Sequence, residues 1–216
     1  MQTIHLAKSN SLLKRFLNQL RDVNTQNNAL LFRHNIEKIG QILAYEISKT
    51  LSYKSLDVST PLGTKSSADI NEDIVVISIL RAGLALHQGF MSYFDQEAHG
   101  FVSAYRHHEK GSVQFDIRLG YEALPELKNK TLLLIDPMQA TGQSIIEVYK
   151  HLIEKHQPAK IILATIVAAP EGIAYVEKNI PSATLFTADI DDCLNEKYYI
   201  MPGLGDAGDL AYGVKV

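Results

Sequence analysis

A stretch with side chains suited to binding a phosphate and a sugar lies at residues 132–144, which read LLLIDPMQATGQS. Its apolar start predicts a buried strand that ends at Asp136, followed by a short loop and a helix opened by Ser144. Thr141, Gly142 and the first backbone N–H groups of that helix would form a phosphate cradle, and Asp136 would accept hydrogen bonds from ribose hydroxyls. The alternative is a plain strand-to-helix turn, with Ser144 as N-cap and Gly142 present for a positive φ. The loop matches neither a Walker A loop nor a dinucleotide fingerprint.

Two arginines have neighbours that suit pyrophosphate binding. Arg81 follows the apolar run of residues 74–80 and precedes Ala82 and Gly83, small residues that let a ligand approach the backbone. Taken alone, a surface arginine at the end of a strand is the simpler interpretation of Arg81. Arg106 alone would be interpreted as a solvated charge, but beside an anion site it would be a second arginine that binds the pyrophosphate.

A glycine-rich segment near the end of the chain, residues 198–213, reads YYIMPGLGDAGDLAYG. Its closely spaced glycines, its proline and its aspartates predict neither a regular helix nor a regular strand. The flanking Tyr198, Tyr199 and Tyr212 favour a loop anchored to the protein. Backbone groups exposed by the glycines would then read the polar edge of a flat base.

Two clusters of metal-binding residue types carry a weaker signal. One consists of His107, His108 and Glu109, which are adjacent in sequence and cannot easily share one ion, so a solvated hairpin is favoured. The other cluster consists of the carboxylates of Asp189, Asp191 and Asp192. A charged turn between two secondary-structure elements is favoured there over a site for a divalent ion.

The elements that must position these loops follow from the apolar pattern. Short apolar runs alternate with helical stretches, which predicts a mostly parallel α/β sheet with strands buried on both faces. The predicted strands cover residues 74–80, 131–135, 160–169 and 183–188, and the predicted helices cover residues 144–156 and 171–179. Residues 99–105 and 112–119 predict an antiparallel hairpin. The first third is predicted to be helical, because apolar residues recur at helical spacing from Leu12 onward, after Ser9 or Asn10 as cap.

Composition limits the classes of protein to consider. The 216 residues suit one compact domain, or at most two small ones, and shares of 46% hydrophobic and 21% charged residues are ordinary for a globular protein. A net charge of −3 gives no general attraction to nucleic acid, so no nucleic-acid partner is expected. Neither a signal peptide nor a membrane-spanning run is recognisable, and the one cysteine, Cys193, cannot form an intrachain disulfide. We therefore expect a cytoplasmic protein with no membrane partner.

Six segments spread along most of the chain carry a resemblance to a known family. They read FRHNIEKIGQILAYE, ILRAGL, IDPMQATGQS, VAAPEGI, DIDDCLNE and YIMPGLGDAGD. Together they resemble the uracil phosphoribosyltransferases of the type I phosphoribosyltransferase superfamily, and the last segment is the most specific of the six. The resemblance implies a single domain over residues 1–216, with a mostly parallel central sheet flanked by helices, an antiparallel hairpin and a small hood. The N-terminal helices within residues 1–55 and the segment 190–216 would form this hood over the base.

The resemblance also implies a role for each site residue. The residues that would bind phosphoribosyl pyrophosphate (PRPP) are Arg81, Arg106, Asp136, Pro137, Met138, Gln139, Ala140, Thr141, Gly142, Gln143, Ser144 and Asp206. Uracil would be bound, largely through main-chain groups, by Ile200, Gly205, Asp206 and Ala207. Asp206, Arg81 and Arg106 would be catalytic, and Mg²⁺ would accompany the pyrophosphate without a dedicated set of protein ligands.

The implied reaction transfers the phosphoribosyl group of PRPP to uracil and yields UMP and pyrophosphate, a step of pyrimidine salvage. PRPP and uracil would be the small-molecule partners, and the family implies a homodimer or homotetramer. The arginines and Mg²⁺ would stabilise the leaving pyrophosphate electrostatically. A hairpin from Arg106 to Ser112 would serve as a lid that excludes water.

The sequence departs from the family pattern at three places. Leu210 replaces a usual basic residue, Gln143 replaces a usual glycine, and residues 107–116 keep little of the usual run of acidic residues and a proline. Two alternatives therefore stay open: a weakly active or inactive regulator of the same fold that senses PRPP or a nucleotide, and a phosphoribosyltransferase for another base. The loop of residues 198–209 argues against the second alternative.

Overall fold

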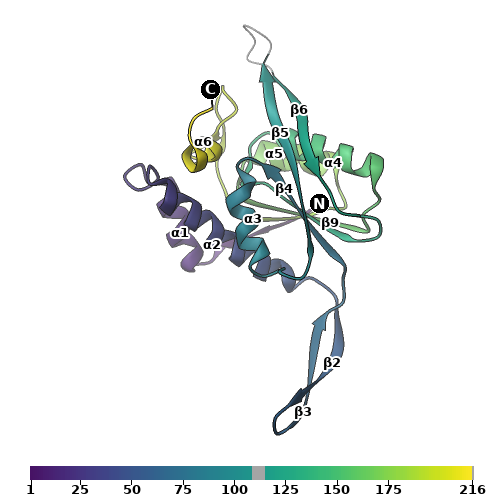
Figure 1. The fold of residues 1–216 in the computed structure, drawn as a ribbon. Helices are drawn as coiled ribbons and strands as arrows, with labels where there is room; N and C mark the ends of the chain where they lie inside the picture. The colour runs from purple at the N-terminus through teal and green to yellow at the C-terminus, as the bar shows by residue number, and fades with distance from the viewer. Residues whose placement is uncertain (109–114, 216) are drawn as a thin grey trace.

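The computed structural model describes residues 1–108 and 115–215, and within them one large sheet forms the centre of the molecule (Figure 1). In spatial order its strands are β1 (Gln2–His5), β10 (Thr184–Ile190), β9 (Lys160–Ala168), β7 (Thr131–Ile135), β4 (Ile74–Leu80), β5 (Ala98–His108) and β6 (Phe115–Ala123). The short β8 (Met138–Gln139) pairs with β9 outside this order. The neighbouring strands run parallel from β1 to β5, and β6 is antiparallel to β5. The predicted mostly parallel sheet is confirmed.

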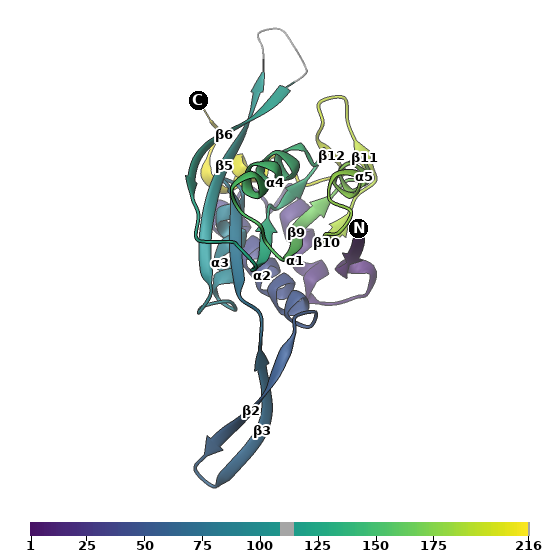
Figure 2. The same ribbon diagram turned by 90° about the vertical axis from the view of Figure 1, so that its right-hand side faces the viewer.

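Helices cover both faces of the sheet (Figure 2). One face carries α1 (Leu12–Arg21), α2 (Ala29–Ser48) and α3 (Gly83–Met91), and the other carries α4 (Gln143–Lys155) and α5 (Pro170–Asn179). Successive side chains of β4 alternate between the two cores. Ile74 and Val76 pack with α1 to α3, whereas Val75 and Ile77 pack with α4 and α5. Burial on both faces explains why this strand is a continuous apolar run in the sequence.

Two antiparallel hairpins project from opposite ends of the molecule (Figures 1 and 2). One pairs β2 (Tyr53–Thr60) with β3 (Gly63–Ile70) and is exposed along nearly all of its length. The other pairs β5 with β6, from Phe101 opposite Ala123 to His108 opposite Phe115. The second hairpin was predicted and is confirmed, although residues 109–114, which include Glu109 and most of the predicted lid, lie outside the described residues.

The prediction that the first third is helical is wrong in two places. Gln2–His5 forms the edge strand β1, which pairs with β10, and Tyr53–Ile70 forms the first hairpin. β1 has only four residues and is an edge strand, and the strands of the hairpin are exposed, so neither segment carries the apolar pattern that marks a buried strand. The predicted cap is also wrong: Ser11 caps α1, and its hydroxyl oxygen accepts a hydrogen bond from the N–H of Leu13 at 3.3 Å.

The C-terminal segment returns to the N-terminal helices. It contains the short strands β11 (Cys193–Leu194) and β12 (Ile200–Met201), which pair with each other, and the helix α6 (Ala207–Tyr212). Arg33 of α2 donates a hydrogen bond to the carbonyl oxygen of Ala211 at 2.6 Å and so fixes the last turn of α6. Among the helices of the described residues, none is long and apolar enough to span a bilayer.

Candidate active site

A cavity of about 640 Å³ opens at the carboxyl ends of β4 and β7, where parallel α/β sheets commonly bind ligands. Three segments far apart in the sequence form its wall: the end of β4, the loop between β7 and α4, and the C-terminal segment. The predicted site residues in this wall are Arg81, Asp136, Met138, Ala140, Ser144, Ile200, Gly205, Asp206 and Ala207. The fold thus brings together the three loops that the sequence singled out.

The loop after β7 is held rigidly against β9. The carbonyl oxygen of Pro137 accepts hydrogen bonds from the N–H groups of Ile166 and Val167, at 3.0 and 3.1 Å. Asp136 is 9% exposed, and its N–H donates to the carbonyl oxygen of Ala164 at 3.1 Å. Its carboxylate, which lines the cavity, is therefore carried on a fixed backbone.

The turn into α4 requires glycine at one position. Gly142 is the N-cap of α4 and has φ of 77°, the left-handed region that favours glycine. A Cβ there would lie 2.9 Å from the carbonyl oxygen of Gly172, in the neighbouring α5. Gly142 brings no side chain to satisfy the N–H groups of the first helical turn, which leaves that turn suited to a phosphate. Ser144 is the second residue of α4 and lines the cavity, so its alternative interpretation as N-cap is wrong.

Five other predicted PRPP residues are not among those that line the cavity: Pro137, Gln139, Thr141, Gly142 and Gln143. Thr141 accepts a hydrogen bond from the N–H of Gln143 at 3.3 Å and so supports the turn. Within the described residues, both amide atoms of the Gln139 side chain and Oε1 of Gln143 are buried without a hydrogen-bond partner. Buried polar atoms without a hydrogen-bond partner destabilise the fold. These amide groups of the loop are therefore able to form further hydrogen bonds.

Arg81 connects the end of β4 to the C-terminal segment. Its Nη2 donates to Asp209 Oδ1 at 2.8 Å and to the carbonyl oxygen of Gly213 at 2.9 Å. Its Nε is buried and has no partner among the described residues. The Leu80–Arg81 peptide bond is cis.

Arg106 lies in β5 opposite Ile117, but its side chain is outside what the structure describes, so its predicted role stays a prediction.

The C-terminal loop is more regular than the sequence predicted. Asp206 is the N-cap of α6, and its Oδ1 accepts a hydrogen bond from the N–H of Asp209 at 3.0 Å. This cap, together with the burial of Ala207 and Ala211, stabilises a six-residue helix where an irregular loop was expected. Leu210, the residue that departs from the family pattern, packs against Gly205 and the core.

Two residues that sequence reasoning missed, Tyr105 and Lys215, also line the cavity. Lys215 is exposed and, within the described residues, its ammonium group has no hydrogen-bond or ion-pair partner. A lone lysine near the end of a chain gives no signal in a sequence. Tyr105, in contrast, directly precedes Arg106 in the sequence, and its position next to a predicted site residue could have indicated that it lines the cavity.

The acidic cluster is not arranged as a metal site. Asp189 and Asp191 both bind the guanidinium of Arg21, so their charges are already matched by a cation. Over residues 1–108 and 115–215 no group of three or more His, Cys, Asp or Glu residues could hold a metal ion. The predicted charged turn is wrong for Asp189, which lies in β10 opposite Val167, whereas Asp191 and Asp192 follow the end of that strand.

Comparison with known proteins decides the family. A family model described as uracil phosphoribosyltransferase matches residues 7–214. The chain belongs to the uracil phosphoribosyltransferase family. A uracil phosphoribosyltransferase of Porphyromonas gingivalis is 45% identical over 217 residues, which cover 100% of both chains. One from Thermococcus gammatolerans is 35% identical over 213 residues, covering 97% of this chain and 93% of that relative.

A solved structure has the same fold along the whole chain. The solved structure of the AQ2163 protein from Aquifex aeolicus matches with a TM-score of 0.87 and 35% identity, over 100% of both chains. The family model and the two relatives confirm the predicted resemblance to uracil phosphoribosyltransferases.

Proposed function

We propose that this chain transfers the phosphoribosyl group of PRPP to uracil, giving UMP and pyrophosphate, as a step of pyrimidine salvage. One observation carries the proposal: a single cavity is lined by Asp136 and Ser144 from the loop after β7, by Arg81, and by Ile200 and Gly205 of the C-terminal loop. Membership of the uracil phosphoribosyltransferase family supports the choice of reaction and base.

PRPP would occupy the half of the cavity nearer the sheet. Asp136 would accept hydrogen bonds from the ribose hydroxyls, and the loop from Ala140 to Ser144 would hold the 5′-phosphate at the start of α4. Arg81, with Arg106 from the hairpin, would bind the pyrophosphate, because a guanidinium matches two phosphate oxygens at once. Lys215 lines the same cavity and would add a third positive charge.

Uracil would lie against the C-terminal loop. Ile200 is 5% exposed and supplies an apolar wall, and Gly205, Asp206 and Ala207 would present main-chain groups to the polar edge of the base. Gly205 has a positive φ of 87°, a backbone conformation that residues with a side chain rarely adopt, and this conformation sets the orientation of its two peptide groups. Asp206 would also lie close to PRPP, between the two substrates.

The chemistry depends on charge more than on a covalent intermediate. The C1′–oxygen bond to pyrophosphate breaks, N1 of uracil bonds to C1′, and the N1 proton leaves. Positive charge develops at the ribosyl centre and negative charge on the leaving pyrophosphate, which Arg81, Arg106 and Lys215 would stabilise. Holding N1 in line with C1′ lowers the barrier further. We assign the role of general base to no side chain.

The carboxylates in the cavity fit a role for Mg²⁺. Asp136 and Asp206 both line the cavity, and carboxylate oxygens are ligands that Mg²⁺ prefers. Two carboxylates are too few for a complete octahedral site, so the ion would be held mainly by the pyrophosphate, with Asp136 and Asp206 nearby. When bound, it would neutralise charge on the leaving group.

We further propose that the chain acts in the cytoplasm as a homodimer or homotetramer. Leu12, Leu30 and Tyr45, on α1 and α2, are 66%, 57% and 53% exposed and would serve as a subunit contact. Cys193 is a free, exposed thiol, which suits a reducing compartment. Sedimentation of the purified chain would give the number of subunits.

Turnover with a panel of bases tests the proposed function. Purified chain, Mg²⁺ and PRPP are incubated with labelled uracil, and in parallel with cytosine, hypoxanthine or orotate, and nucleotide formation is followed. We expect UMP formation and little product from the other bases. Preference for another base would overturn the choice of uracil, and PRPP binding without any product would favour the regulator.

A further inference from the structure

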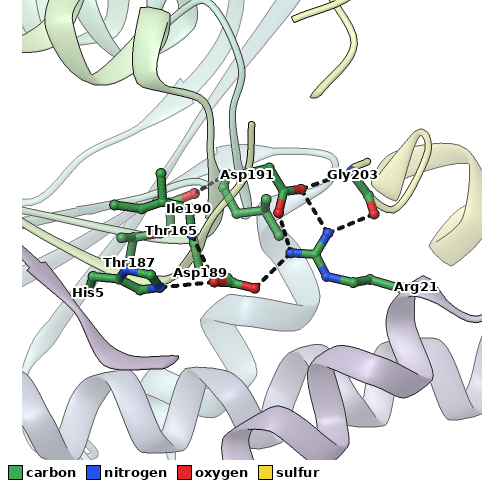
Figure 3. Close-up of polar contacts among 9 residues, drawn as sticks. His5, Arg21, Thr165, Thr187, Asp189, Ile190, Asp191 and Gly203 are labelled. Carbon is green, nitrogen blue, oxygen red and sulfur yellow. Dashed lines mark hydrogen bonds and ion pairs between the residues drawn. The ribbon is translucent and has the colours of Figure 1, made fainter. Parts of the chain in front are cut away.

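Arg21, the last residue of α1, is the centre of a polar network next to the proposed base-binding loop (Figure 3). Its Nη1 and Nη2 donate to the two carboxylate oxygens of Asp191, each at 2.7 Å. Nη2 also donates to Asp189 Oδ2 at 3.0 Å. Arg21 and Asp191 thus form a bidentate ion pair with two parallel hydrogen bonds. Such a pair is strong and fixes the relative orientation of the two side chains.

The same ion pair holds both backbone hydrogen-bonding groups of Gly203. Arg21 Nη1 donates to the carbonyl oxygen of Gly203 at 2.8 Å, and Asp191 Oδ2 accepts from the Gly203 N–H at 2.8 Å. Gly203 has φ of 64°, and a Cβ there would lie 2.1 Å from the carbonyl oxygen of Ile200. The turn from Ile200 to Gly205 is thus fixed at its middle by two charged side chains.

Burial makes this arrangement sensitive to the loss of a partner. Asp191 is 7% exposed, and a buried carboxylate without its cation is strongly destabilising. Asp189 is more exposed, with 28% of its side chain accessible, and its other oxygen lies 2.9 Å from Nε2 of His5 in β1. Asp191 therefore connects Arg21 to Gly203, whereas Asp189 connects Arg21 to the edge of the sheet.

Neither Arg21, Asp191 nor Gly203 is in the cavity wall, but Ile200 and Gly205, on either side of Gly203, are. We propose that Arg21 and Asp191 are positioning residues that set the conformation of the loop from Ile200 to Gly205, and thereby the affinity of the site for the base. The inference rests on the proposed function, because it takes this loop to read uracil.

The network acts on the base side of the cavity. The loop from Asp136 to Ser144, which would bind the ribose and the 5′-phosphate, is held by other contacts, the hydrogen bonds from Ile166 and Val167 to Pro137. A change at Arg21 or Asp191 should therefore weaken uracil binding and leave PRPP binding nearly intact. A purely structural role would not separate the two substrates.

The test compares steady-state kinetics of full-length wild-type, Arg21→Lys and Asp191→Asn proteins, with KM measured for each substrate and thermal unfolding measured in parallel. Lysine keeps the positive charge, but its ammonium group cannot form the bidentate hydrogen bonds to Asp191 while also donating to the carbonyl oxygen of Gly203. Asparagine keeps the shape of Asp191 and removes its charge. In both variants we expect KM for uracil to rise about tenfold or more, and KM for PRPP to change by less than about twofold.

Asp189→Asn is the matched control, because Asp189 binds Arg21 without contacting Gly203. We expect its KM for uracil to stay within about twofold of wild type. An equal rise in both KM values, or a lower unfolding temperature with unchanged KM values, would overturn the positioning role. If Arg21→Lys fails to fold, the outcome for Asp191→Asn decides. Absence of uracil turnover in the wild-type chain would instead overturn the proposed function itself.

Discussion

Nη2 of Arg81 lies 2.8 Å from Oδ1 of Asp209, a residue 128 positions later in the chain. Through this contact the end of β4, where pyrophosphate would bind, is attached to α6, whose N-cap Asp206 lines the cavity. The same guanidinium also binds the carbonyl oxygen of Gly213. The two halves of the proposed active site are therefore joined through one side chain.

Arg81→Lys should lower kcat/KM by about tenfold to a hundredfold, because a charged hydrogen bond contributes about 1.5–3 kcal/mol and lysine cannot form the fork. Steady-state kinetics at varied PRPP concentration measures this. Thermal unfolding should change little, because the Arg81–Asp209 pair is partly exposed and such pairs contribute about 1 kcal/mol or less. An Arg81→Lys protein with wild-type kcat/KM would show that Arg81 does not bind pyrophosphate.

Lys215→Ala should raise KM for PRPP several-fold and leave KM for uracil unchanged, because an ammonium in the cavity attracts the pyrophosphate. The effect should shrink as salt concentration rises, because salt screens exposed charges. Lys197→Ala is the matched control, since Lys197 is exposed and outside the cavity wall. Equal effects of the two substitutions would argue against a specific role for Lys215.

A pH dependence of stability follows from the buried His87. It is 1% exposed, its Nδ1 is hydrogen-bonded to the Ser78 hydroxyl at 2.5 Å, and its ring packs on His99. Burial, and secondarily the charge of His99, lowers the pKa of His87 to about 4 from an ordinary value of 6.5. The unfolded chain therefore binds a proton at a higher pH than the folded chain does.

Stability should accordingly fall as pH drops from about 6.5 to about 4, by about 3 kcal/mol from this group. Urea unfolding at several pH values in this range measures the slope. A His87→Gln protein, which cannot take up a proton there, should lose this part of the slope. Identical slopes in the two proteins would contradict the account of His87.

The buried part of the fold was predictable from the sequence. The runs at residues 74–80 and 131–135 coincide with β4 and β7, because strands buried on both faces must be apolar throughout. The hairpin β2–β3 was not predicted, since its strands are exposed and mostly polar, and their large apolar residues Tyr53, Leu56 and Val58 do not contribute to a core. The turn residues between Thr60 and Gly63, which include Pro61, were a local signal for it.

The candidate site was predictable where its residues lie on local motifs. The loop from Asp136 to Ser144 carries its own turn and helix start, so its chemistry is visible in sequence. The contacts of Arg21 with Gly203 and of Arg33 with Ala211 span 182 and 178 positions, and a single arginine in a helix looks like a solvated charge. Only the three-dimensional fold reveals such long-range partners.

The measurement that tests the central claim most directly is conversion of labelled uracil to UMP, with PRPP and Mg²⁺, by the wild-type and Asp136→Ala proteins side by side. The account predicts rapid turnover by the wild type. It also predicts a loss of about a hundredfold or more in kcat/KM for Asp136→Ala, which removes the acceptor for the ribose hydroxyls. The variant should remain folded by circular dichroism. Undiminished turnover by a folded Asp136→Ala protein would contradict the assignment of this cavity as the PRPP site.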